Sequence, residues 1–329
     1  MNRILKYFFW ILIVLFLIVF SYFFIGWAPK TENIVWGVNF SQKHAKYLGL
    51  DWKETYTSIL DDLKAKNLKV AAHWDLIEPQ KGSYDFSDMD WQVKEAEKRQ
   101  ANLILIIGMK TSRWPECHIP EWAKGLSKDE QQGAILAEIK ELVLRYKNSP
   151  SLYAWQPENE ALFPFGECPW TDQDFLKKEA ELVKQLDPMH LVEISDSGEG
   201  SFWFKAAKIG DVVGVTTYKK VWMSQMNSYI SYPLPSVFYY RKAQLVKNLF
   251  KKDVWSVELQ AEPWCPVLLY DCPTMEQKKT MTPQIFNSNV EFARKAGFDH
   301  IYLWGAEWMY WMKTNQNDPS IWEEAKNLF

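Results

Sequence analysis

Eight short apolar runs of the kind that form buried strands recur along the chain, and each is followed by a stretch with helical periodicity. The runs are continuous rather than alternating between apolar and polar residues, which is typical of parallel strands covered on both faces. They lie at residues 34–40, 68–74, 102–109, 152–157, 190–195, 211–218, 253–259 and 300–305. Eight strand–helix units in series predict a (β/α)8 TIM barrel rather than a doubly wound sheet, which usually has fewer strands.

The helices expected between these strands carry recognisable start signals. In the first, Asp51 is placed as the N-cap and Glu54 follows three residues later, which is the spacing of a capping box. Further helices are expected at about 89–101, 129–146, 172–186, 201–208, 236–250, 283–296 and 319–328. Because no linker rich in Gly, Ser or Pro divides the series, we expect residues 31–329 to form a single barrel domain.

The first thirty residues form a separate unit. No charged side chain occurs from Tyr7 to Pro29, and these 23 residues at helical rise would cover roughly 34 Å, enough to cross a bilayer core of about 30 Å. Arg3 and Lys6 precede the apolar segment, so the positive-inside rule predicts a cytoplasmic N-terminus and a barrel on the extracytoplasmic side. A cleaved signal peptide is the alternative, with an apolar stretch of usually about 7 to 15 residues. We favour a single-pass anchor over residues 1–30, with 7–27 in the lipid bilayer.

Charge and cysteine content exclude several other classes of protein. The formal net charge is -3 without a long run of one sign, so no nucleic-acid partner is expected. The cysteine spacings fit no zinc motif and only five His are present, so no metal site is expected. Disulfides are expected instead, because exported thiols oxidise. Loops after the third and fourth strands are neighbours, which predicts Cys117–Cys168, and Cys265–Cys272 would close a short loop after the seventh strand.

Two glutamates stand at strand ends, where TIM barrels build their active sites. Glu160 follows the fourth strand and Glu258 ends the seventh, on roughly opposite sides of the barrel mouth. In a retaining glycosidase two carboxyl groups about 5 to 5.5 Å apart share the chemistry: one attacks the anomeric carbon, and the other protonates the leaving oxygen and then activates water. The charge of the first would raise the pKa of the second, which must hold a proton.

Two stretches of the chain resemble the clan A glycoside hydrolases, the retaining TIM-barrel enzymes that include families 5, 10, 35 and 42. RYKNSPSLYAWQPENE, which ends in Asn159-Glu160, resembles their strand-4 signature. HWDLIEPQKGSYDFSDMD, residues 73–90, is similar to the segment after strand 2 in families 42, 35 and 10. The resemblance covers residues 34 to about 312.

The resemblance also implies residue roles. Glu160 would be the acid/base, Glu258 the nucleophile, and Asn159 the hydrogen-bond partner of the sugar 2-hydroxyl. Tyr218 would hold the nucleophile, and Trp304 would form the floor of a sugar subsite. The nucleophile stays open between Glu258 and Glu262; Glu258 is preferred because it directly follows the apolar strand. Strand 2 carries Ala72-His73 where family 5 enzymes usually carry an Arg, so the family and the sugar stay open.

Further polar and aromatic residues near strand ends are candidates for contact with a saccharide. Sugars present apolar C–H faces that pack on aromatic rings, and the chain contains 18 Trp. The additional substrate-binding candidates are Asn39, His73, Trp74, Glu262, Trp264, Glu307 and Trp308. We expect about half of the tryptophan candidates to be structural, and His73 is equally well interpreted as a hydrogen-bonded core histidine.

These features together predict a membrane-anchored retaining glycosidase that cleaves a β-linked oligo- or polysaccharide. No metal or organic cofactor is expected: strand 1 lacks His-x-His, and no Gly-rich phosphate loop follows strands 7 and 8. The alternative hypothesis is a barrel that binds glycan without cleaving it and is therefore not an enzyme. A transglycosylase is a variant of the glycosidase hypothesis. Carboxyl groups of Glu160 and Glu258 more than about 10 Å apart would favour the binding protein.

Overall fold

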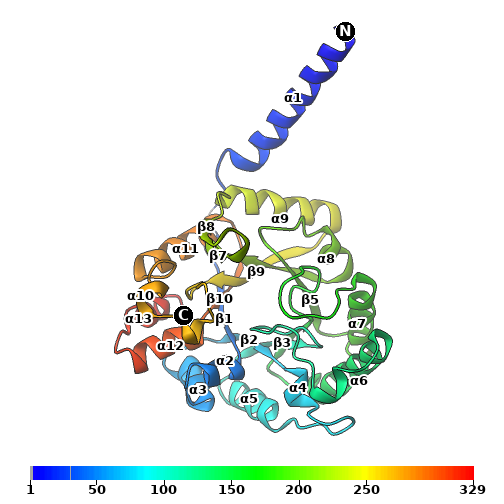
Figure 1. Cartoon of the computed structure of the whole chain (residues 1–329), viewed down its shortest axis with the longest axis vertical. Helices are drawn as coiled ribbons and strands as arrows, with labels where there is room; N and C mark the ends of the chain where they lie inside the picture. Colours follow the sequence, from blue (N-terminus) through cyan, green and yellow to red (C-terminus); the bar gives the residue numbers. More distant parts are fainter. Residues whose placement is uncertain (1–2, 30) are drawn as a thin grey trace.

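The computed structural model describes residues 3–29 and 31–329, and most of them form a closed barrel of eight parallel strands with an outer ring of helices (Figure 1). The strands follow one another around the barrel in the order β1-β10-β9-β6-β5-β4-β3-β2. They are β1 (Val35–Phe40), β2 (Asn67–Ala71), β3 (Asn102–Ile107), β4 (Leu152–Pro157), β5 (Leu191–Asp196), β6 (Val212–Thr217), β9 (Asp253–Gln260) and β10 (His300–Trp304). Each coincides with one of the eight predicted runs, so the (β/α)8 fold is confirmed.

Eight of the helices coincide with those predicted from the sequence. These are α3 (Trp52–Asp61), α5 (Ser87–Lys98), α6 (Lys128–Tyr146), α7 (Gln173–Leu186), α8 (Phe204–Ile209), α9 (Ser236–Phe250), α11 (Pro283–Lys295) and α13 (Ser320–Lys326). Asp51 caps α3 through the backbone N–H groups of Lys53 and Glu54. The predicted capping box is wrong, because the Glu54 carboxylate instead accepts a hydrogen bond from the Tyr310 hydroxyl at 2.8 Å.

Several short elements at the barrel mouth were not predicted. Their bounds are α2 (Gln42–Tyr47), α4 (Trp74–Ile77), α10 (Thr274–Gln277), α12 (Ala306–Asn315) and the hairpin β7 (Lys220–Met223) with β8 (Ser228–Ser231). The hairpin follows β6, and α12 follows β10, so both lie at carboxyl ends of strands. The loops of the mouth therefore carry more regular structure than the sequence indicated.

Apart from a small cluster at the barrel mouth, apolar side chains fill two separate regions of the barrel. The larger region lies between the strands and the helices. The smaller one includes Ile104, Trp255 and Tyr302, which come from three different strands. Lys69 on β2 and Glu193 on β5 are also completely buried. A buried charged side chain is rare unless it is paired, so these two residues direct attention to the barrel interior.

Helix α1 (Arg3–Phe24) projects away from the barrel beside α9 (Figure 1). Its stretch Leu5–Phe24 has the length and apolar composition of a membrane span, and none of its most apolar window is buried. The rings of Phe23 and Phe24 lie 5.8 and 5.4 Å from that of Phe238 on α9. The predicted boundary between anchor and barrel, residue 30, lies outside the described residues.

Candidate active site

Glu160 and Glu258 both lie at the carboxyl end of the barrel and are almost completely buried, with 9% and 2% of their surfaces exposed. Thr216 on β6 connects them: its backbone is in register with Glu258 on β9, and its hydroxyl lies 3.4 Å from Oε1 of Glu160. Burial and the neighbouring charge of Glu258 raise the pKa of Glu160 well above its usual range. A raised pKa is what a group that must hold a proton near neutral pH requires, so Glu160 has the property of a general acid.

Glu258 is held by one donor on each carboxylate oxygen. The hydroxyl of Tyr218 donates to Oε2 at 2.9 Å, and Nζ of Lys69 lies 3.3 Å from Oε1. Burial and the charge of Glu258 raise the pKa of Tyr218 well above its usual range, so this hydroxyl stays a donor. Tyr218 lies where the resemblance implied, whereas Lys69 is an addition that the sequence analysis missed.

Lys69 also fixes the orientation of Asn159. Its Nζ donates to Oδ1 of Asn159 at 3.3 Å, and Nε2 of Gln156 donates to the same oxygen at 3.0 Å. The Nδ2 of Asn159 therefore points elsewhere, and it lies 3.5 Å from Oε2 of Glu116. One buried lysine thus contacts both Asn159 and Glu258.

Two further carboxyl groups that the sequence analysis missed face this region. Glu116, in the loop after β3, is buried, and this burial raises its pKa to about 7 against the opposing effect of Lys110. Glu199, after β5, accepts hydrogen bonds from the Tyr218 backbone N–H and the Tyr239 hydroxyl, and burial raises its pKa to about 7. Their burial gives the mouth several carboxyl groups that are only partly ionised near neutral pH.

Glu262 and Glu307 form a separate network around Arg113. The Arg113 guanidinium donates to Glu262 and, at 2.9 Å, to Oε2 of Glu307, and it stacks on the Trp304 ring with 3.9 Å between the guanidinium carbon and the ring centroid. Burial alone would raise the pKa of Glu262, but Arg113 and His44 outweigh it and lower the pKa to about 2. Glu307 also accepts from the Ser41 backbone N–H at 2.6 Å. Both carboxylates therefore have a protein partner, and Oε2 of Glu262 is buried without a hydrogen bond among the described residues.

Two tryptophans proposed to bind sugar are buried in the protein instead. Trp74 is completely buried in α4, and its indole donates to Glu78 at 2.9 Å. Trp308 is 2% exposed in α12 and donates to Gln277 at 2.7 Å. Neither ring offers a face to a saccharide in this structure, because each packs within the hydrophobic core.

The side chains of Asn39 and His73 form hydrogen bonds with neighbouring strands and loops. Nδ2 of Asn39 donates to the carbonyl oxygens of Val257 and Leu303, which ties β1 to β9 and β10. The His73 ring nitrogens lie 3.0 Å from the Ser41 hydroxyl and 2.7 Å from the Thr111 hydroxyl. Burial lowers the pKa of His73 well below its usual value. This arrangement fits the interpretation of His73 as a hydrogen-bonded core histidine.

Aromatic rings from two loops meet over the carboxyl end of the barrel. The ring of Trp264 is half-buried and lies 5.1 Å from that of Tyr218 and 6.0 Å from that of Phe165. The Trp264 ring thus packs edge-on against the ring of Tyr218, whose hydroxyl donates to Glu258. Trp264 belongs to the loop after β9 and contacts Phe165 in the loop after β4.

Both predicted disulfides are confirmed, and both brace these loops. Cys117–Cys168 joins the loops after β3 and β4 with a Cα–Cα distance of 5.2 Å. Cys265–Cys272 closes a loop after β9 with a Cα–Cα distance of 6.4 Å. Across the part of the chain that the structure describes, no group of three or more His, Cys, Asp or Glu is arranged to hold a metal ion.

Comparison with known proteins finds partial sequence similarity to β-glycan hydrolases. No family model matches the chain. It is 27% identical over 176 residues to mannan endo-1,4-beta-mannosidase F of Aspergillus fumigatus, covering 44% of this chain and 39% of that protein. It is 33% identical over 86 residues to mannan endo-1,4-beta-mannosidase A of Emericella nidulans, covering 26% and 22%. The chain thus spans less than half the length of the relatives that it matches.

Solved structures show the same fold over most of the chain. The endo-beta-1,4-mannanase of Thermotoga petrophila matches with a TM-score of 0.57 at 15% identity, covering 83% of this chain and 68% of that one. GH5_18 of Bifidobacterium longum matches with a TM-score of 0.58 at 14% identity, covering 83% and 70%. Together with the closed barrel, these comparisons confirm the predicted resemblance of this chain to the clan A glycoside hydrolases.

Proposed function

We propose that this protein is a retaining β-glycosidase in which Glu160 is the acid/base and Glu258 the nucleophile. The observation that carries the proposal is the contrast between the two buried carboxyl groups. Burial and the charge of Glu258 favour the protonated form of Glu160. Glu258 instead accepts a hydrogen bond from the Tyr218 hydroxyl at 2.9 Å, and its other oxygen lies 3.3 Å from Nζ of Lys69.

In the first step, a carboxylate oxygen of Glu258 attacks the anomeric carbon while Glu160 gives its proton to the glycosidic oxygen. The bond to the leaving group breaks, and the sugar becomes an ester of Glu258. In the second step, Glu160 takes a proton from water, the oxygen of that water attacks the anomeric carbon, and Glu258 leaves as a carboxylate. Lys69 and Tyr218 are placed to stabilise the charge that returns to Glu258.

Two neighbours are placed to assist these steps. The Thr216 hydroxyl lies 3.4 Å from Oε1 of Glu160 and can donate a hydrogen bond to it once Glu160 has lost its proton. Asn159 is held by Lys69 at its oxygen, so its N–H group is the one available to a sugar 2-hydroxyl. Glu262, the other nucleophile candidate, is engaged by Arg113, which favours Glu258.

The names of the relatives select β-1,4-mannan as the first substrate to test, followed by xylan. β-Glucan and galactan complete the series as other β-linked polysaccharides. We also propose that α1 is an uncleaved anchor that holds the barrel on the extracytoplasmic side of a membrane. Its 20-residue apolar stretch and its exposure support this proposal. Resistance of the full chain to alkaline carbonate extraction would test it.

The activity is tested with aryl β-glycosides and these polysaccharides, using the full chain, Glu160→Gln and Glu258→Gln. Each substitution is expected to lower the rate about a thousandfold or more, because each removes a group from the chemical step. Glu181→Gln, a change on the exposed surface of α7, serves as the matched control and should leave the rate unchanged. NMR should show the β-anomer as the first product. Full turnover by either variant, or an inverted product, would refute the assignment.

The same assay distinguishes the two alternatives. Binding of a saccharide without cleavage by the wild-type chain would identify a glycan-binding barrel. Longer saccharides appearing when an acceptor sugar is added would identify a transglycosylase, in which the acceptor hydroxyl replaces water in the second step.

A further inference from the structure

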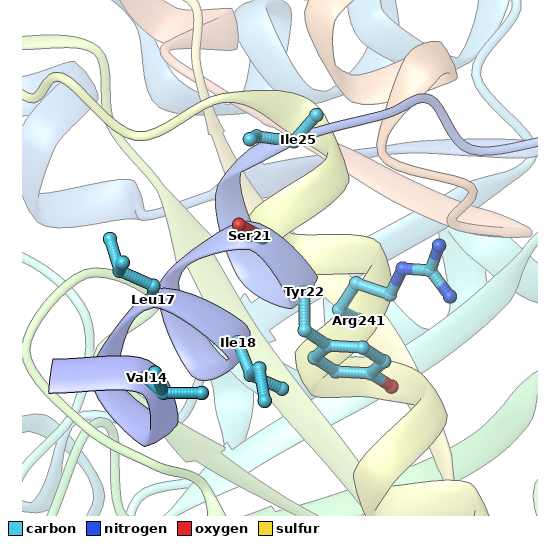
Figure 2. A pocket seen from close by; sticks show the side chains of 7 residues that line it. All are labelled: Val14, Leu17, Ile18, Ser21, Tyr22, Ile25 and Arg241. Carbon is cyan, nitrogen blue, oxygen red and sulfur yellow. The ribbon is translucent and has the colours of Figure 1, made fainter. Parts of the chain in front are cut away.

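A groove lies between α1 and α9 (Figure 2), and none of the candidate active-site residues lines it. One wall is a single face of α1, because its residues recur at helical spacing of three and four. That wall is formed by Val14, Leu17, Ile18, Ser21, Tyr22 and Ile25. Arg241 of α9 closes the groove near its barrel end. The result is a long apolar wall with one cation at its end.

The Arg241 side chain has no anionic partner in the described part of the chain. None of the arginine ion pairs there involves Arg241. Its Nε is buried and has no hydrogen-bond partner among the same residues. The guanidinium carbon lies 4.9 Å from the centroid of the Tyr22 ring and 5.8 Å from that of Tyr240. Aromatic faces hold the cation in place, but its buried Nε–H still needs an acceptor.

The surroundings of Arg241 match the boundary between a membrane and water. If α1 spans a bilayer, Tyr22 in its last turns lies at the level of the lipid headgroups, where Tyr is enriched and Arg extends toward the phosphates. Helix α9 packs on this end of α1 through Phe238, so it lies at the same level. Guanidinium binds phosphate through two parallel hydrogen bonds, and this geometry favours phosphate over a neutral headgroup.

We propose that this groove binds one phospholipid of the extracytoplasmic leaflet, with its phosphate on Arg241 and an acyl chain along the exposed face of α1. The proposal rests on the membrane anchoring proposed above. It adds a consequence: the lipid links α1 to α9 and so fixes the position of the barrel on the membrane surface. Helix α1 would then act as part of a binding site rather than as a flexible tether.

The test is native mass spectrometry of the detergent-solubilised full chain, offered phosphatidylglycerol or monogalactosyldiacylglycerol with the same acyl chains. The galactolipid has no phosphate. The wild-type chain should retain at least fivefold more phosphatidylglycerol than galactolipid, with one lipid per chain. Arg241→Gln should remove that preference, and Arg241→Lys should keep part of it. Lys247→Gln removes a cation from the same helix, where Lys247 is paired with Asp253, and should change nothing.

Equal retention of the two lipids by the wild-type chain, or an unchanged preference in Arg241→Gln, would overturn the proposal. A dimer that forms in place of lipid binding would assign the groove to a second copy and overturn it as well. A result against the membrane anchor itself can be distinguished from a result against the lipid site. Release of the chain by alkaline carbonate, with a new N-terminus near residue 29, would remove α1 and with it both the anchor and the groove.

Discussion

Replacing Lys69 with Met is expected to move the acidic limb of the kcat/KM–pH profile to higher pH by about 1.5 to 2 units. Lys69 is completely buried, and its Nζ lies 3.3 Å from Oε1 of Glu258. Methionine is close to lysine in length and removes the charge without a large change in volume. The variant therefore isolates the electrostatic role of the lysine.

The magnitude follows from the distance. Two unit charges 3.3 Å apart attract by about 5 kcal/mol at an effective dielectric constant of about 20. Relaxation around the site recovers part of this energy, so we take about half, or 2 to 3 kcal/mol, as the loss. One pH unit corresponds to about 1.4 kcal/mol, which gives the stated shift. At a pH below the wild-type limb, kcat/KM should fall by about 30- to 100-fold.

The assay is kcat/KM for an aryl β-glycoside across a pH series, with folding checked by circular dichroism. Lys69→Arg keeps the charge and should keep the limb near its wild-type position, although its wider guanidinium lowers the rate. Lys66→Met removes an exposed lysine adjacent to β2 and is the matched control. A merely structural role of Lys69 would lower kcat/KM equally at every pH. That uniform loss, with no shift of the limb, would refute the electrostatic argument.

Two further predictions concern stability. Burial raises the pKa of Glu158 to about 7 and those of Glu138 and Glu179 well above their usual range. Above about pH 4.5 these carboxyl groups are therefore protonated in the native state and lose their protons when the chain unfolds. Urea unfolding should therefore show that the free energy of unfolding falls between pH 5 and 7, by up to about 1.4 kcal/mol per pH unit for each group. The slope should be smaller in Glu138→Gln. A free energy of unfolding that rises with pH would contradict this. Removing the disulfide between the loops after β3 and β4, whose cysteines are 51 residues apart, should cost about 4 kcal/mol, against about 2.5 kcal/mol for the pair 7 residues apart. Urea unfolding of the paired Cys→Ser variants checks this order, which a larger loss for the short loop would contradict.

The sequence predicted the strands well because each strand is a local pattern. Parallel strands buried on both faces appear as continuous apolar runs, and the eight runs match the strands within a few residues. Helix α12 was missed for a physical reason. Most of its residues are buried, including Trp308 and Met309, so its sequence lacks the polar face by which a surface helix is recognised.

The candidate site was only partly predictable, because its contacts join residues that are distant in sequence. Glu160 and Glu258 could be selected from their positions at strand ends. Lys69 lies 189 residues from Glu258 along the chain, and no local motif connects them. A signal was nevertheless present: a single lysine within the apolar run LKVAA, which was expected to be covered on both faces. A charge in such a run requires a buried partner, and that partner had to come from elsewhere in the barrel.

The choice of lysine at this position has a chemical consequence. A guanidinium is a rigid fork that suits one carboxylate, whereas an ammonium is a compact charge whose three donors can be divided among partners. Lys69 divides them between Asn159 and Glu258 at equal distances of 3.3 Å. In the proposed mechanism these two residues act on adjacent carbons of one sugar ring, the second and the anomeric. A movement of Lys69 toward one partner would lengthen its contact with the other, so the ammonium couples recognition of the 2-hydroxyl to the charge on the nucleophile.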